Sequence, residues 1–248
     1  MRSEGRRTSL ELMADATRAA GGASNTVVQA LFKLALVFAG LAALGYAQNP
    51  TVDFSGLQQR AEAGDAAAQF ELGVRYHEGQ GVAQSYSEAF KWFKLAAGQG
   101  DPDAEFNLGV MYEKGRGVAP NYDQAMDWYR KAAAQDYAPA EYNLGVMFDK
   151  ARGVPLDYSE ALSWYSKAAD QNFSAAQYNL GLLYYYGQGI PQNYVLAYEW
   201  ISLAAAGAMG EDQKKFSRML EEVAGKMNAR QIADAKILAA QWVPAANK

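Results

Sequence analysis

The chain has 248 residues, half of them apolar, which is enough for a packed core in one or two ordinary domains. Its net charge is −4 and it has no stripe of clustered lysine and arginine, which argues against a nucleic-acid partner. The absence of cysteine excludes disulfides, thiolate metal ligands and cysteine nucleophiles.

Residues 1–47 are predicted to be a targeting segment. Leu34–Ala47 is a run of apolar or small residues that follows Lys33. Its length fits the apolar core of a secretory signal, about 7–15 residues, and is below the roughly 20 that a membrane-spanning helix needs. We therefore expect a signal peptide that is cleaved after Ala47, which places the mature chain in the periplasm or outside the cell.

Alternatives to a cleaved signal stay open, because more than thirty residues precede the apolar run. The true start could lie later, with Val27 or Val28 encoded by an alternative start codon. The run could also be an uncleaved inner-membrane anchor, with the rest of the chain facing the periplasm. A buried core helix is the remaining interpretation.

Residues 48–64 are predicted to be a linker and a half-repeat cap, in which Phe54–Ala63 forms a lone second helix. Four copies of a 36-residue unit follow, marked by a Leu-Gly pair and a tryptophan. A fixed period of this length indicates one supersecondary unit stacked on itself. The predicted units are 65–100, 101–136, 137–172 and 173–208. The marker residues are Leu72-Gly73, Leu108-Gly109, Leu144-Gly145 and Leu180-Gly181, with Trp92, Trp128, Trp164 and Trp200.

The first helix of each unit places alanine, leucine and an aromatic residue at i, i+4 and i+8, which is one helical face. The glycine after the leucine is unexpected, because glycine inside a helix costs roughly 0.5–1 kcal/mol relative to alanine. Its fourfold repetition predicts that the backbone of the partner helix approaches closely and leaves no room for a Cβ. The predicted helices run through Ala68–Tyr76, Ala104–Tyr112, Ala140–Phe148 and Ala176–Tyr184.

The second helix of each unit is predicted to begin after an N-cap residue. These caps are Ser85, Asn121, Asp157 and Asn193. The first three have Glu or Gln three residues later, which predicts capping boxes with Glu88, Gln124 and Glu160. Further along, alanine and tryptophan alternate on one face, as in close-packed helix pairs.

The two helices of a unit are linked by G-x-G-V or a close variant, which begins at Gly79, Gly115, Ala151 or Gly187. The first position is expected to take a positive φ at the helix end. At Ala151, which replaces glycine, we expect strain of about 1 kcal/mol or a shifted turn. The same backbone conformation is expected between units, at Gly64, Gly100, Asp136 and Asn172.

Residues 209–248 are predicted to cap the array. Glu211–Val223 is charged, as a terminal helix with one solvent face should be. Asn228 is expected to begin a last helix, with a capping box to Gln231, and Pro244 to end it.

The repeated pattern A-x-x-x-L-G-x-x-Y, then G-x-G-V, then A-x-x-W-x-x-x-A-A resembles the Sel-one-like repeat, a relative of the tetratricopeptide repeat. The resemblance implies an all-α, right-handed α/α superhelical solenoid of four repeats, whose first helices line the concave face. It also implies a protein-binding adaptor, often exported in bacteria, in envelope signalling, cell-wall or exopolysaccharide regulation, or host contact. A cysteine-rich branch is linked to β-lactam binding, which is not expected for this cysteine-free chain.

A stripe beside the core face of the first helices is the candidate groove for a protein or peptide partner. Along it the chemistry changes from charged Glu113-Lys114 to three consecutive tyrosines. Tyr185 and Tyr186 are expected to be partly exposed as an aromatic anchor, or else to pack against the C-terminal cap. The asparagines match those that hold a peptide backbone in tetratricopeptide relatives. The predicted groove residues are Phe106, Asn107, Val110, Tyr142, Asn143, Val146, Tyr178, Asn179, Leu182, Tyr185 and Tyr186.

The sequence contains no recognisable catalytic set, so we expect no enzyme activity, cofactor or metal site. Its one histidine, His77, is expected on the surface or in the groove, and neither S-x-x-K nor G-x-S-x-G occurs. The main hypothesis is a non-catalytic adaptor in the bacterial envelope. The alternatives are a structural component that binds cell-wall glycan through exposed aromatic residues, and a cell-wall or β-lactam hydrolase, which the missing nucleophile disfavours.

Overall fold

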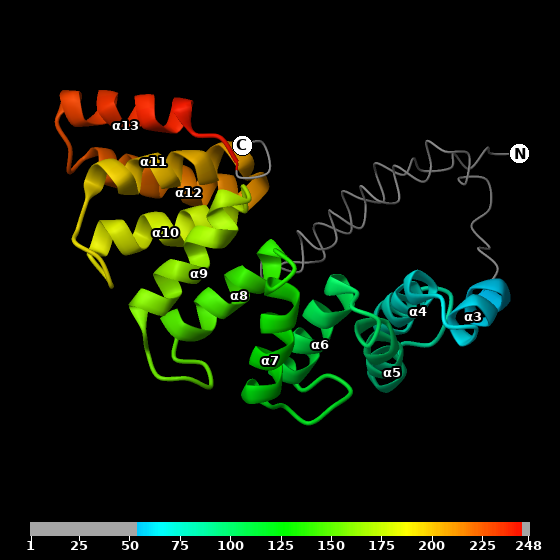
Figure 1. Ribbon diagram of the computed structural model, residues 1–248. Coiled ribbons are helices and arrows are strands. Elements are labelled where there is room, and N and C mark those ends of the chain that lie inside the picture. The colour runs from blue at the N-terminus through cyan, green and yellow to red at the C-terminus, as the bar shows by residue number, and fades with distance from the viewer. Residues whose placement is uncertain (1–53, 245–248) are drawn as a thin grey trace, which may run out of the picture. The chain divides into compact units, whose positions relative to one another are not determined.

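The computed structural model describes residues 54–244, and these form eleven α-helices without a strand (Figure 1). The predicted targeting segment, 1–47, lies outside the described residues. Within 54–244, no helix combines the length and apolarity that crossing a bilayer requires. The helices are α3 (Phe54–Glu62), α4 (Ala66–Glu78), α5 (Tyr86–Ala97), α6 (Pro102–Lys114), α7 (Tyr122–Ala133), α8 (Ala138–Asp149), α9 (Tyr158–Asp170), α10 (Ser174–Tyr186), α11 (Tyr194–Gly207), α12 (Gly210–Ala224) and α13 (Ala229–Gln241).

The helices pair in chain order, and each pair packs on the next. The four hairpins are α4/α5, α6/α7, α8/α9 and α10/α11, and the second helix of each of the first three also packs against the first helix of the following hairpin. The lone helix α3 packs on α4. The described chain is therefore the all-α, right-handed α/α superhelical solenoid that the sequence predicts.

All four predicted N-caps of the second helices are confirmed. Each cap side chain accepts a hydrogen bond from a backbone N–H in the first turn of α5, α7, α9 or α11. The predicted capping boxes are wrong, because the N–H of each cap is already bound elsewhere. Ser85 N–H donates to the Tyr76 carbonyl at 2.8 Å, and the other three caps repeat this bond to the preceding helix. In α13 both capping-box bonds form, between Asn228 and Gln231.

The mid-helix glycines lie where the partner helix approaches, as predicted, but at three of them the contact is with a ring. A Cβ on Gly109 would lie 2.5 Å from two carbons of the Tyr129 ring. Phe93 covers Gly73 and Tyr165 covers Gly145 in the same way. The expected backbone contact is found only at Gly181, beside the side chain of Ile201 and the carbonyl of Ala197.

The residue after each tryptophan, not the tryptophan itself, fills the centre of the hairpin. Phe93, Tyr129, Tyr165 and Ile201 are all buried, whereas the tryptophans are half-buried. Each tryptophan packs on the core cluster that precedes it along the array. Trp92, for example, packs against the cluster that α3 and α4 form with Leu57, Ala61, Ala68 and Leu72. The tryptophans therefore contribute to contacts between hairpins.

The first link position takes a positive φ in all four units, as predicted. At Ala151 φ is 51°, so this non-glycine residue adopts the left-handed conformation itself. Its helix, α8, also ends one residue earlier than its counterparts, at Asp149. Asp136 and Asn172 between units take φ values of 55° and 63°, which their short polar side chains tolerate.

The second glycine of the link has a role that our reading of the sequence missed. It packs against the start of the second helix in the preceding unit. A Cβ on Gly117 would lie 2.3 Å from the carbonyl oxygen of Tyr86, and Gly153 and Gly189 meet Tyr122 and Tyr158 similarly. These positions join one hairpin to the next, because only glycine leaves room for the neighbouring backbone at Gly117 and Gly189 and for the Tyr122 side chain at Gly153.

The C-terminal helices cover the last hairpin. α12 and α13 both pack on α11. α12 buries Phe216, Met219 and Val223, and Phe216 stacks on Tyr178 of α10 with ring centroids 4.2 Å apart. The Trp242 ring, just after α13, contacts Trp200 edge to face. α12 and α13 thus continue the packing beyond the fourth unit.

Candidate functional site: the row along the first helices

The predicted groove residues all lie on α6, α8 and α10, and we call them the groove row. Most are partly exposed: Asn107, Val110, Tyr142, Asn143, Val146, Asn179 and Leu182. Three are buried: Phe106, Tyr178 and Tyr185. Tyr186 is 58% exposed, which makes it the most accessible aromatic side chain of the row.

The aromatic residues near the start of the row hold neighbouring units together. Phe106 packs on Tyr129 within its own unit and on Tyr137 at the start of the next. Tyr142 makes the equivalent two contacts, with Tyr165 and Phe173. Phe106 is therefore buried by packing between units, and Tyr142 remains only partly exposed.

The expectation that Tyr185 and Tyr186 are both partly exposed is wrong for Tyr185. It is buried, and its hydroxyl donates to Oε1 of Glu222 on α12 at 2.8 Å. That hydrogen bond, together with burial, raises the pKa of Tyr185 to about 12, so the hydroxyl stays protonated at neutral pH. Tyr185 thus packs against the cap, the alternative left open by the sequence, while Tyr186 stays exposed.

Two buried tyrosine–carboxylate pairs lie beside the row. Tyr129 donates its hydroxyl to Oε2 of Glu113 at 2.8 Å, and Tyr165 donates to Oδ2 of Asp149 at 3.1 Å. Burial, and then the charge on Glu113, raise the pKa of Tyr129 well above its ordinary value. Burial and the charge on Asp149 do the same for the pKa of Tyr165. Both hydroxyls are therefore fixed as donors.

Basic side chains complete these pairs and reach the surface. Glu113 has a side chain only 8% exposed and pairs with Lys114 at 2.9 Å and with Arg152 of the next unit at 3.1 Å. Asp149 pairs with Lys150 at 3.0 Å. The carboxylates are thus neutralised within the fold, and the exposed cations are the charged groups that a partner can reach.

The asparagines of the row already take part in this network. Asn143 lies near the Tyr129 hydroxyl and lowers its pKa, and Asn179 acts in the same way on Tyr142 and Tyr165. Asn107 donates to the carbonyl of Asp103 at 2.7 Å. Because an amide has two N–H donors and a carbonyl acceptor, one internal bond leaves further groups for a partner.

This pairing, of a carboxylate near the end of a first helix with a tyrosine of the second helix, occurs only in the second and third units. The first unit has His77 and Phe93 at the equivalent positions, and the fourth has Tyr185 and Ile201. His77 contacts Oε1 of Glu78 through Nδ1 at 2.5 Å and packs on the Tyr86 ring. Among residues 54–244, no group of three or more potential ligand side chains is placed to hold a metal ion.

The sequence carries a signal for these pairs. An acidic residue precedes a tyrosine by 16 positions in the two middle units, and both are replaced together in the outer two. Such joint replacement is what direct contact between the two positions produces.

Comparisons with known proteins agree with this architecture. The Sel1 repeat model matches residues 66–101, 102–137, 138–173 and 174–208. A solved Sel1 repeat protein from Oxalobacter formigenes is 33% identical, over 72% of this chain and 74% of its own, with a TM-score of 0.61. A protective antigen of uropathogenic Escherichia coli strains, which displays an SLR fold, is 32% identical over 75% of this chain and 47% of its own, with a TM-score of 0.49. No curated protein is significantly similar.

Proposed function

This chain belongs to the Sel1 repeat family, and from that premise we propose that it is a non-catalytic adaptor that holds a protein or peptide partner along the groove row. Sel1 repeat proteins generally act as protein-interaction scaffolds and are typically non-catalytic. In this proposal the partner is a protein of the bacterial envelope, and the adaptor serves envelope signalling or cell-wall or exopolysaccharide processes.

The observation that carries the proposal is the mixture of accessible groups on one row. Tyr186 offers an exposed aromatic ring at one end of the row. Val110, Val146 and Leu182 offer partly exposed apolar surface along it. Aromatic anchors flanked by polar groups are typical of the residues that dominate binding energy at protein interfaces.

The basic residues beside the row suggest which partner groups are favoured. Lys114, Lys150 and Arg152 are about half exposed, and the carboxylates that they contact are nearly buried. An extended segment with acidic side chains could pair with these cations, while its backbone bonds to the asparagine amides.

The proposal retains the division of the chain made from the sequence. Residues 1–47 export the chain or anchor it, 48–64 link and cap the array, 65–208 bind the partner, and 209–248 close the C-terminal end. Export to the periplasm, or beyond the cell, would bring the groove row into the compartment where envelope proteins assemble.

Truncating the exposed anchor tests the proposed function. We expect Tyr186→Ala to weaken capture of the cognate partner from envelope extract by about tenfold or more, as for a typical interface hot spot. Chemical crosslinking with quantitative mass spectrometry would measure this, with circular dichroism to show that the fold is kept. Leu95→Ala is the control, because Leu95 is similarly exposed but lies on the second helix α5.

An unchanged partner set in Tyr186→Ala would contradict the proposed groove. Retention on cell-wall polysaccharide gels that depends on Tyr186, with no captured protein, would favour the glycan-binding alternative instead. Exposed aromatic rings serve both kinds of ligand, so the two measurements are made on the same variants.

A further inference from the structure

One buried position is occupied by glutamine in the outer units and by glutamate in the middle units. The four residues are Gln69, Glu105, Glu141 and Gln177, one on each first helix. All four are buried, Glu141 with only 2% of its surface exposed. Ionisable side chains this deeply buried are rare in proteins unless they are paired.

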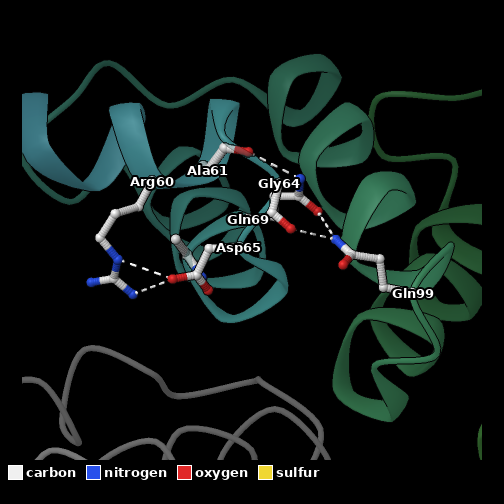
Figure 2. A network of polar contacts seen from close by, with 7 residues as sticks. Arg60, Ala61, Gly64, Asp65, Gln69 and Gln99 are labelled. Atoms are coloured by element: carbon white, nitrogen blue, oxygen red, sulfur yellow. Dashed lines mark hydrogen bonds and ion pairs between the residues drawn. The ribbon is translucent and has the colours of Figure 1, made fainter.

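The glutamine units show what the position does (Figure 2). Gln69 donates from Nε2 to the carbonyl of Ala61 at 3.0 Å, at the C-terminal end of α3. Its Oε1 accepts from Nε2 of Gln99 at 2.8 Å, and Gln99 also contacts the Gly64 carbonyl at 3.0 Å. The side chain thus ties its own unit to the end of the preceding second helix. Gln177 repeats the first bond to Ala169, at 3.4 Å.

The glutamate units retain the acceptor half of this arrangement. Gln135 donates to Oε2 of Glu105 at 2.9 Å, and Gln171 donates to Oε2 of Glu141 at 2.8 Å. The donor half requires a proton, because an ionised carboxylate can only accept hydrogen bonds. The equivalent carbonyl for Glu141 is that of Ala133, the last residue of α7. The C-terminal end of a helix also disfavours a nearby negative charge.

We propose that Glu141 is a proton-operated switch at the junction between the second and third units. With the proton bound, its carboxyl O–H donates to the Ala133 carbonyl and ties α8 to the end of α7, as Gln69 ties α4 to α3. Without the proton, this bond is lost and a buried charge faces the helix end. Proton binding therefore sets the strength of this junction.

The surroundings of Glu141 favour proton binding near neutral pH. Burial raises the pKa of Glu141 to about 7, and the charges on Asp136 and Asp170 act in the same direction. Lys167 of α9 and the Gln171 hydrogen bond lower this pKa. On α7, Arg130 and Lys131 are exposed, and α10 contains no lysine, arginine or acid.

Glu105 occupies the same position in the second unit, but its surroundings favour proton binding less strongly. Burial raises its pKa, while the Gln135 hydrogen bond and the charge on Lys131 lower it. We therefore assign the switch to Glu141, the more deeply buried of the two.

The pH dependence follows from the tighter proton binding of the folded state. In the unfolded chain Glu141 returns to its ordinary pKa of 4.5. Between that value and about 7 the folded state holds the proton and the unfolded state releases it. The stabilisation of the folded chain by the Glu141 proton is fully present below the unfolded-state pKa of 4.5. It is lost as the pH rises through the folded-state pKa of about 7. From pH 5 to pH 8, the unfolding equilibrium constant should rise on the order of fiftyfold through this group.

Two measurements on the Glu141→Gln variant test the switch. In carbon NMR of glutamate-labelled protein, one carboxyl signal, absent from Glu141→Gln, should titrate near pH 7. In urea unfolding at pH 5 and pH 8, Glu141→Gln should be more stable than the wild-type chain at pH 8, and its stability difference between the two pH values should be smaller by the roughly fiftyfold factor in the unfolding constant assigned to Glu141. Glu221→Gln, a change at an exposed glutamate of α12, is the control and should retain the wild-type difference.

The proposal is overturned if the Glu141 signal titrates below pH 5. It is also overturned if Glu141→Gln and Glu221→Gln show the same stability difference between the two pH values. Other acids with raised pKa, such as Glu105 and Glu199, contribute to the pH dependence of stability with the same sign in the wild-type chain and in both variants. The comparison between the two variants therefore isolates Glu141. Neither measurement depends on the binding partner.

Discussion

Gly109→Ala is expected to lower the free energy of unfolding by about 2–4 kcal/mol, although alanine is the better helix former. The new Cβ would lie 2.5 Å from the Tyr129 ring. That ring is fully buried and its hydroxyl is held by Glu113, so it cannot swing away. Forcing atoms into a filled core costs more than the roughly 1 kcal/mol that helix propensity returns. Urea unfolding followed by circular dichroism would measure the loss.

A double-mutant cycle supplies the control for this prediction. In a Tyr129→Leu background, the smaller side chain leaves room, so Gly109→Ala should cost far less than in the wild-type chain. The two substitutions should therefore be strongly non-additive, as contacting residues are. Additive losses, or a stabilising effect of Gly109→Ala in the wild-type chain, would contradict the ring-on-glycine contact.

Gly117→Ala is expected to cost about 3–4 kcal/mol, from a left-handed backbone and a steric clash together. Gly117 has a φ of 71°, and its Cβ would lie 2.3 Å from the carbonyl oxygen of Tyr86 in the preceding unit. A backbone group in a helix start cannot shift as a flexible side chain can. The substitution should weaken the packing of the first hairpin on the second. Native-state hydrogen exchange should therefore accelerate in α4 and α5 first.

Gly81→Ala is the matched control, because it shares the backbone conformation without the neighbour. Its φ is 74° and nothing lies within 4 Å of the added Cβ. We expect a loss of about 1 kcal/mol, the cost of the left-handed conformation alone. Equal losses for the two variants would show that the second link glycine does not join the hairpins.

The features predicted correctly from the sequence are those set within one unit. Helix starts such as Asn121, helix ends such as Gly115, and the left-handed Asp136 depend on residues a few positions away. Because each unit repeats these signals at the same spacing, one unit confirms the interpretation of the next. Even Ala151 takes the positive φ that its glycine counterparts take, since the surrounding turn imposes it.

The features that were missed depend on contacts between helices, within a unit or between units. The link glycine Gly117 meets Tyr86, which lies 31 positions earlier and in another hairpin. The capping box expected at Ser85 fails because the Tyr76 carbonyl takes its N–H. Pairings of this kind are formed by tertiary packing and leave no local signature.

The candidate site was predicted less completely than the fold for the same reason. Whether Tyr185 is exposed depends on where α12 lies, and α12 is beyond the last repeated unit, where the periodic pattern ends. The sequence placed Tyr178 and Tyr185 on one face of α10, but it could not show that Phe216 and Glu222 cover them.

The most direct test of the stacked-hairpin account is proton NMR of Gly109 and Gly145. Each lies against the ring of a buried tyrosine on its partner helix, Tyr129 or Tyr165. The account predicts Hα signals displaced by ring currents and strong nuclear Overhauser effects from each glycine to its tyrosine ring. Unshifted Hα signals, with no such effect to either ring, would contradict it.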